Sequence, residues 1–217
     1  MFRTAVLSAL LAVAAYASSA WLTHDFQVWT AEGARRLEVA LHPIPAPDVK
    51  IDGPSIDISI GPQPLLLSQF LADGQSVTLV DFVYTRCQTV CLALGSTFQQ
   101  MQATLQAASP DDAAAQKVKL LSISFDGQHD DPPVLKAYAT RLGADPLRWP
   151  FVRVPDEQET QRLLADFQVV VVPDGRGDYE HNAALLVIDQ HGRLVRIFDY
   201  AEQQLALDYA RYLAGAG

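Results

Sequence analysis

Two cysteines give this sequence its clearest chemical potential. They are Cys87 and Cys91, the only cysteines in the chain, and Gln88-Thr89-Val90 separates them. Residues four apart at the start of a helix project in similar directions. Two thiols with this spacing can hold one metal ion, or form a disulfide if their Cα atoms come within about 7 Å. The spacing therefore points to soft-metal binding or to thiol–disulfide exchange.

The segments on either side of the cysteines predict where they lie in the fold. Residues 77–84 are apolar and β-branched, which indicates a buried central strand, and residues 92–108 favour a helix. In an open α/β sheet the functional crevice lies outside the carboxyl ends of the strands. A helix N-terminus stabilises negative charge and so lowers the pKa of a thiol there. We expect both thiols to be accessible, partly ionised and close together.

Composition and charge exclude one broad class of function. The chain has 217 residues, of which 49% are hydrophobic and 19% charged, and a net charge of −9. A nucleic-acid-binding protein needs a basic surface, which supplies most of the affinity. We expect one globular domain with an additional apolar segment, and no nucleic-acid partner.

The additional apolar segment lies at the start of the sequence. Arg3 is followed by residues 4–22 without a charge, a length that is about enough to span a bilayer. Because the positive charge precedes the apolar run, the N-terminus is expected inside and the main domain in the periplasm or an equivalent space. A cleaved signal peptide with Ala15-Tyr16-Ala17 as its processing site is the alternative. In either case the main domain faces an oxidising compartment, where a disulfide can persist.

The remaining chain predicts an α/β domain. We expect an anchor over 1–22, a Pro-containing stiff linker over 23–48 and the domain over 49–217. Strands alternate with helices, and a hairpin and one helix close the chain, which is the order of a thioredoxin-like three-layer sandwich. Beyond the two segments described above, the expected elements are a short helix over 30–37, an edge hairpin over 51–60, a short helix over 64–71, strands over 118–125 and 151–154, helices over 132–142 and 156–167, a hairpin of 183–188 and 194–198, and a helix over 203–214.

Three motifs, taken together, resemble the Sco/SenC family of membrane-anchored, thioredoxin-like copper proteins. The first is V-D-F-V-Y-T-R-C-Q-T-V-C, ending at Cys91. The second is Asp178-Tyr179-Glu180-His181-Asn182 before a strand. The third is Ile123-Ser124-Phe125-Asp126 through Asp130 and the helix after it. The resemblance covers roughly residues 51–213. Gln88 and Leu92 depart from the family, which usually has proline at both positions, and Asn182 stands where serine is frequent.

The resemblance implies a site and a role. Cys87, Cys91 and His181 would bind copper, as Cu(I) or Cu(II), with one ion per chain. The protein would be a metallochaperone that matures the dinuclear copper centre of a respiratory cytochrome oxidase. Its partners would be the copper-receiving oxidase subunit, other copper carriers or thiol reductants, and the membrane. Thiolates select Cu(I), and imidazole suits either oxidation state.

Other interpretations stay open. Cys87 and Cys91 could form a structural disulfide, although a small closed loop stabilises little. A zinc site would need a fourth ligand. The pair could instead be the redox centre of a membrane-tethered thiol–disulfide oxidoreductase, with Cys87 attacking. Asp81 bears on that reading, because its spacing to Cys87 resembles thioredoxin, where a buried Asp assists proton transfer. It could equally be a hydrogen-bonded carboxylate on a polar side of its strand.

The sequence also gives expectations for several acidic, histidine and aromatic residues outside the predicted ligand set. Asp126 and Asp130 follow a strand end and could lie near the cysteines or simply shape turns. His129 lies in the same loop, whereas three other histidines have no expected role: His24, His42 and His191. Aromatic residues within the expected strands are predicted to belong to the core, namely Tyr84, Trp149 and Phe151.

Overall fold

The fold is described by a computed structural model that covers most of the chain. The described residues are 2–23, 25–26, 28–54, 65–87, 90–175 and 179–216, without the side chains of residues 2 and 90–92. They form two compact units, Met1–Glu38 and Val39–Gly217. The expected edge hairpin over 51–60 falls mostly on residues 55–64, which lie outside the described part.

The first unit consists of helix α1 and the start of helix α2. Helix α1 spans Phe2–Leu22, and Arg3–Leu22 is long and apolar enough to cross a membrane, a test that a signal sequence also passes. Helix α2 spans Ala31–Leu41 and begins after Thr30, whose hydroxyl accepts a hydrogen bond from the Gly33 amide at 3.0 Å. The short helix expected here, with Thr30 as its cap, is therefore confirmed.

The second unit is built on a mixed sheet with the strand order β1-β8-β7-β2-β3-β4. Strands β2, β3 and β4 are parallel, whereas β7 runs antiparallel to both β2 and β8, and β8 antiparallel to β1. The strands of this sheet are β1 Ile44–Pro45, β2 Val77–Val83, β3 Val118–Ser124, β4 Phe151–Arg153, β7 Ala184–Ile188 and β8 Arg193–Asp199. A separate two-stranded sheet pairs β5, Val171–Pro173, with β6, Tyr179–His181.

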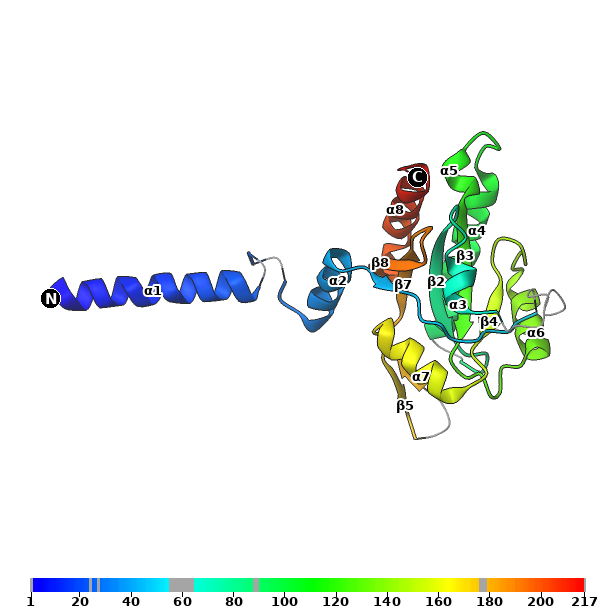
Figure 1. The fold of residues 1–217 in the computed structure, drawn as a ribbon, viewed down its shortest axis with the longest axis horizontal. Coiled ribbons are helices and arrows are strands. Elements are labelled where there is room, and N and C mark those ends of the chain that lie inside the picture. The colour runs from blue at the N-terminus through cyan, green and yellow to red at the C-terminus, as the bar shows by residue number, and fades with distance from the viewer. Residues whose placement is uncertain are drawn as a thin grey trace. The chain divides into compact units, whose positions relative to one another are not determined.

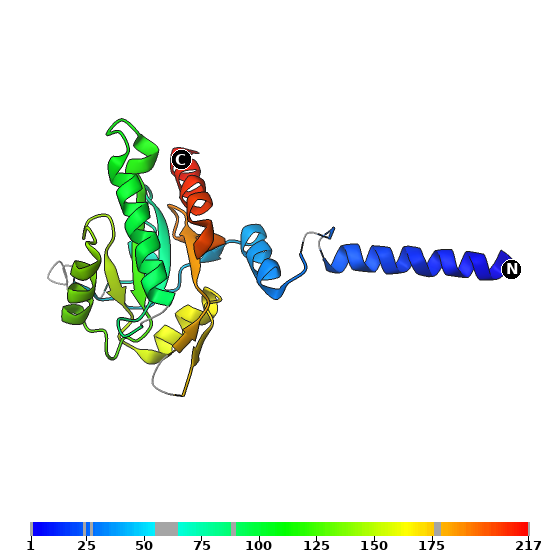
Figure 2. The same cartoon turned by 180° about the vertical axis from the view of Figure 1, so that it is seen from behind.

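Helices cover both faces of the mixed sheet. They are α3 Leu67–Leu71, α4 Val90–Ala107, α5 Ala113–Gln116, α6 Pro132–Leu142, α7 Glu157–Asp166 and α8 Gln203–Ala216, with a 3₁₀ turn over Tyr200–Glu202. One apolar cluster joins the sheet to α4, α6 and α8, and the other joins it to α3 and α7. The two clusters put α3 and α7 (Figure 1) on the face of the sheet opposite to α4, which Figure 2 shows in front of the sheet, so the domain has three layers.

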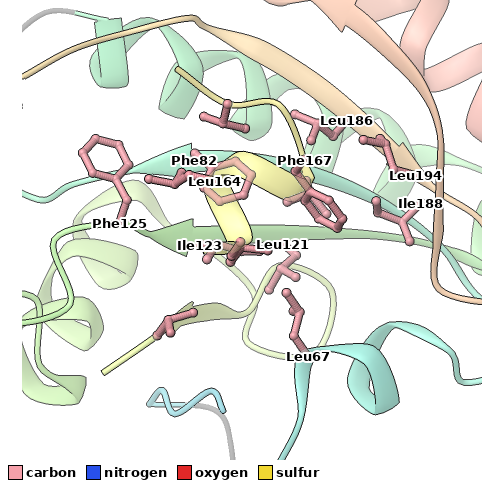
Figure 3. Packing of buried hydrophobic residues seen from close by; sticks show 14 of the residues in the cluster. Leu67, Phe82, Leu121, Ile123, Phe125, Leu164, Phe167, Leu186, Ile188 and Leu194 are labelled. Carbon is pink, nitrogen blue, oxygen red and sulfur yellow. The ribbon is translucent and has the colours of Figure 1, made fainter. Parts of the chain in front are cut away.

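Alternation along β2 assigns its side chains to the two clusters. Phe82 and its even-numbered neighbours pack with α7, where the rings of Phe82 and Phe167 are 6.4 Å apart (Figure 3). Val77, Leu79 and Val83 pack against the α4 side. All seven residues of the strand are buried, as expected for a central strand with a helical layer on each face.

Most expected elements are confirmed, often within one or two residues of their predicted ends. Helix α6 begins at the predicted place, with Asp131 as its cap and Gly143 in the left-handed conformation at its end. Some features differ from expectation. Ile44–Pro45, inside the expected linker, forms edge strand β1 on β8, and the short helix α5 was not expected. The β5–β6 hairpin was not expected.

Candidate metal centre

Cys87 lies in a tight turn directly after β2. Its amide donates a hydrogen bond to the Tyr84 carbonyl at 3.2 Å, and its side chain is only 4% exposed, within the apolar cluster on the α7 side of the sheet. The accessible thiol expected from the sequence is therefore not found at Cys87. Helix α4 begins at Val90, so Cys91 lies in its first turn. The side chain of Cys91 is outside the described part, and the proximity of the two thiols stays a prediction.

Asp130 holds the turn that carries Cys87. This carboxylate is fully buried and accepts hydrogen bonds from the Thr85 amide at 3.0 Å and the Thr85 hydroxyl at 2.6 Å. It also accepts one from the Ser124 hydroxyl, at 2.6 Å, at the end of β3. Asp130 thus ties the loops after two adjacent strands together, which fixes the backbone just before Cys87.

Asp126 fixes the residue next to Cys87 in a similar way. It is 6% exposed and binds the Arg86 guanidinium at 2.7 Å and the His129 Nδ1 atom at 2.8 Å. The hydrogen bond to Asp126 is the main reason why the pKa of Arg86 is raised. The alternative in which these two carboxylates lie near the cysteine loop is the one that the structure shows, and their oxygens are occupied by protein donors.

His181 lies in strand β6, which was not among the expected elements. Its backbone is in register with Val171 of β5. Its ring is 5.3 Å from that of Phe125 and 6.5 Å from that of Tyr84, centroid to centroid. Burial lowers the pKa of His181, and a hydrogen bond with the Asn182 backbone partly opposes this effect. A neutral imidazole at neutral pH is the form that binds a metal.

An aromatic group therefore connects two of the predicted ligands. Tyr84, Phe125 and Tyr179 pack with ring centroids 5.2 to 5.5 Å apart. Cys87 belongs to the same apolar cluster as these rings, and His181 packs against two of them. Tyr84 thus links the two residues: its carbonyl binds the Cys87 amide in the turn after β2, and its ring packs against that of His181.

Asp81 is the fourth predicted site residue, and it lies inside the core. It is fully buried, on the side of β2 that faces α4, and neither carboxylate oxygen makes a well-formed hydrogen bond to a described residue. Burial raises its pKa to about 7, an effect that nearby Ser122 opposes only in part. The reading of Asp81 as a carboxylate on a polar side of the strand does not fit, because every residue of β2 is buried.

Other histidines and carboxylates do not complete a site. Among the described side chains, which exclude that of Cys91, no group of three His, Cys, Asp or Glu residues could hold a metal ion. His129 bonds to Asp126, and His191 is exposed at the β7–β8 turn. His24 lies outside the described residues. Cys91, whose side chain is outside the described part, stays the predicted third ligand beside Cys87 and His181.

A pocket of about 220 Å³ adjoins the aromatic group. The loop after β3 and helix α7 form its walls, and its lining includes Phe125, Asp126, His129, Glu157 and Tyr179. Burial and the negative charge of Asp126 raise the pKa of Tyr179. Any molecule in this pocket would touch the aromatic group that also contacts His181.

Asp130→Asn is expected to destabilise the domain by about 2 to 3 kcal/mol, because an amide cannot accept all the hydrogen bonds that reach this buried carboxylate. Denaturant unfolding measures the effect. Asp131→Asn is the matched control: it removes the same charge one residue away and keeps a good helix cap. Equal stability of the two variants would show that Asp130 does not hold the turn.

Comparison with known protein families gives a consistent match. A model of the SCO1/SenC family matches residues 71–213. A curated relative, the SCO1 protein homolog of Bacillus subtilis strain 168, is 25% identical over 128 residues, which cover 58% of this chain and 63% of the relative. The chain therefore spans less than two thirds of that relative's length.

Solved structures with the same fold include copper-bound proteins. ScoI from Bradyrhizobium japonicum with copper bound is 26% identical, with a TM-score of 0.51, covering 64% of this chain and 85% of that one. BsSco, described as a member of the Sco family of cytochrome c oxidase assembly proteins, aligns with a TM-score of 0.64 at 17% identity, covering 81% and 96%. The fold of the present chain is thioredoxin-like, and the apolar helix α1 precedes it.

Proposed function

Because this chain belongs to the SCO1/SenC family, we propose that it binds copper through Cys87, Cys91 and His181 and supplies it to the dinuclear copper centre of a respiratory cytochrome oxidase. The observation that carries the proposal is the approach of Cys87 and His181 to one aromatic group. The copper-bound ScoI structure and the family description of BsSco support it.

The chemistry of the donors fits copper better than zinc. Two thiolates and one imidazole form a soft, three-donor set that suits Cu(I), and the imidazole also suits Cu(II). Zinc prefers four protein ligands in a structural site. The nearest carboxylates, Asp126 and Asp130, are engaged with Arg86, Thr85 and Ser124. A three-donor site leaves copper a vacant position, which a receiving ligand can occupy during transfer.

We place the copper-binding domain outside the cytoplasm. Helix α1 would act as an uncleaved anchor in the inner membrane, with Arg3 and the N-terminus inside and the domain in the periplasm. The alternative is a cleaved signal peptide. If the anchor is uncleaved, the full-length protein should sediment with membranes after a carbonate wash. Recovery of a shorter, soluble mature protein would show that the segment is a cleaved signal peptide.

A second function, thiol–disulfide exchange, is favoured by Asp81. Asp81 lies on the α4 side of β2, and α4 carries Cys91 in its first turn, so a carboxyl with a pKa of about 7 there is suited to exchange a proton with the Cys91 side of the dithiol. In that reaction the Cys87 thiolate would attack a substrate disulfide, and Cys91 would then displace the substrate thiol. The protein would end as the Cys87–Cys91 disulfide, and the substrate would gain two electrons and two protons. Periplasmic copper-ligand cysteines of an oxidase would be suitable substrates.

His181→Ala tests the copper proposal. The variant is expected to lose Cu(II) binding and to bind Cu(I) about 10-fold to 100-fold more weakly, because two thiolates still provide a soft site for Cu(I). Copper titration of the full-length protein in detergent, with a competing chelator for each oxidation state, measures both affinities.

His191→Ala provides the matched control, since this histidine is exposed at the turn between β7 and β8. It should bind both forms of copper like the wild type. If His181→Ala also binds Cu(II) like the wild type, His181 is not a ligand. If the wild type binds no copper but rapidly reduces a test disulfide, the second function is the correct one.

A further inference from the structure

We propose that Tyr84 is a positioning residue whose hydroxyl holds strand β6, and with it His181, against the Cys87 turn. The inference rests on the proposed copper function for its consequence, but not for the contact itself. Tyr84 was predicted from the sequence only as a core residue, and the proposal adds a positioning role. Tyr84 makes contacts in three directions, through its carbonyl, its ring and its hydroxyl group.

The carbonyl and ring of Tyr84 face the two predicted ligands. The carbonyl accepts the hydrogen bond from the Cys87 amide at 3.2 Å, which closes the turn after β2. The ring lies 6.5 Å from that of His181 and 5.2 Å from that of Phe125. Tyr84 is 1% exposed, so its position is set by the packed core. One rigid side chain thus lies between the cysteine turn and the histidine strand.

The hydroxyl of Tyr84 binds the backbone of β6. It donates to the Tyr179 carbonyl and accepts from the Tyr179 amide, each at 3.3 Å. A single hydroxyl can do both, because it has one donor hydrogen and two acceptor lone pairs. Tyr179 lies two residues before His181 on the same strand. These contacts fix the start of β6 to the end of β2.

Strand β6 needs such an attachment. In the described part of the chain it pairs with β5 alone, in a two-stranded sheet separate from the main one. An isolated two-stranded hairpin is at best marginally stable in water. Val171 and Tyr179 pack partly against the apolar cluster, but such packing is not directional. The hydrogen bonds to Tyr84 supply the direction and thereby set the distance from His181 to the Cys87 turn.

Tyr84→Phe removes the hydroxyl and keeps the ring. In the metal-free protein, the Tyr179 amide is expected to exchange its hydrogen with solvent about tenfold faster, since it loses the Tyr84 hydroxyl as its hydrogen-bond acceptor. Exchange measured by NMR on the full-length protein in detergent gives this rate. Tyr209→Phe is the matched control: Tyr209 packs on Phe198 and Arg196, in helix α8 and away from β6, and its loss should leave the Tyr179 rate unchanged.

Copper titration of the same variant tests the consequence. Cu(II) affinity is expected to fall about tenfold and Cu(I) affinity less than threefold, since Cu(II) depends more on the imidazole. If the exchange rate of the Tyr179 amide is unchanged in Tyr84→Phe, the attachment is overturned, regardless of the copper affinities. Suppose that His181→Ala abolishes Cu(II) binding, so that His181 is a ligand. If Tyr84→Phe then speeds the exchange of the Tyr179 amide but leaves the Cu(II) affinity unchanged, the positioning role is overturned. Faster exchange in a protein that binds no copper overturns the proposed function and leaves the attachment standing.

Discussion

Replacement of Cys87 by serine is expected to lower the affinity for Cu(I) by more than about 100-fold. Loss of a residue that only hydrogen-bonds to a metal ligand already costs about 10-fold to 100-fold in metal affinity, and loss of a direct ligand should cost more. A serine hydroxyl is a hard donor that does not ionise at neutral pH, so it does not replace a soft thiolate. Competition with a Cu(I) chelator, on the reduced full-length protein in detergent, measures the loss.

Cys87→Ala separates ligand loss from structural damage. Cys87 is 4% exposed in an apolar cluster, so a serine hydroxyl there is expected to destabilise the domain more than an alanine methyl group. Both variants should nevertheless lose copper equally. Cys91→Ser should behave in the same way if Cys91 is the second thiolate. Stoichiometric Cu(I) at wild-type affinity in either alanine or serine variants at position 87 would contradict the proposed ligand set.

The regular part of the fold was predictable from local pattern. Residues 77–83 and 118–124 are mostly apolar and rich in Val, Ile and Leu, which is how strands buried on both faces appear in a sequence. Helix α6 carries explicit signals at both ends, Asp131 with two prolines at the start and Gly143 at the end. Signals of this kind are local, so they do not depend on the rest of the fold.

The elements that the sequence did not reveal carry weak local signals. Strand β6, Tyr-Glu-His, has no alternation of apolar and polar residues, and β5 ends in Pro173, which suggested the end of a strand. Pairing between them is what makes both extended. Strand β1 contains Pro45, and proline is tolerated there because the strand lies at the sheet edge. The linker composition therefore concealed a strand.

The residue types of the candidate site were predictable from the sequence, but the residues that position them were not. The cysteine spacing and His181 were visible, whereas the burial of Cys87 was not, because it follows from packing around Tyr84 and Phe125. Tyr84 was interpreted as a core residue, which is correct for its ring but omits its hydroxyl. The signal that could have pointed to it is its polar atom: a buried tyrosine hydroxyl usually has a hydrogen-bond partner. The partner itself lies 95 residues away.

Asp81 links the stability of the domain to pH in a direction opposite to that of a salt-bridged carboxylate. Its pKa is raised from 3.8 to about 7 by burial, so between these values the folded protein holds a proton that the unfolded chain has released. Stability contributed by the neutral carboxyl is therefore complete at low pH and is lost as the pH rises toward about 7. Above that pH, folding must bury a charge that has no well-formed hydrogen bond among the described residues.

Asp81→Asn is expected to remove this loss, which amounts to about 3 kcal/mol between pH 5 and pH 8 for the wild type. Denaturant unfolding of both proteins at the two pH values gives the difference, in which any fixed cost of the buried amide cancels. The same variant tests the redox function: a thiol–disulfide exchange rate at least tenfold slower assigns Asp81 as a proton carrier, and an unchanged rate with copper binding intact assigns it to the core alone. Asp189→Asn, which removes another buried carboxylate at the β7–β8 turn, should leave the exchange rate unchanged. If the wild type and Asp81→Asn lose equal stability between pH 5 and pH 8, Asp81 does not hold a proton in the folded protein, and its part in exchange is excluded as well.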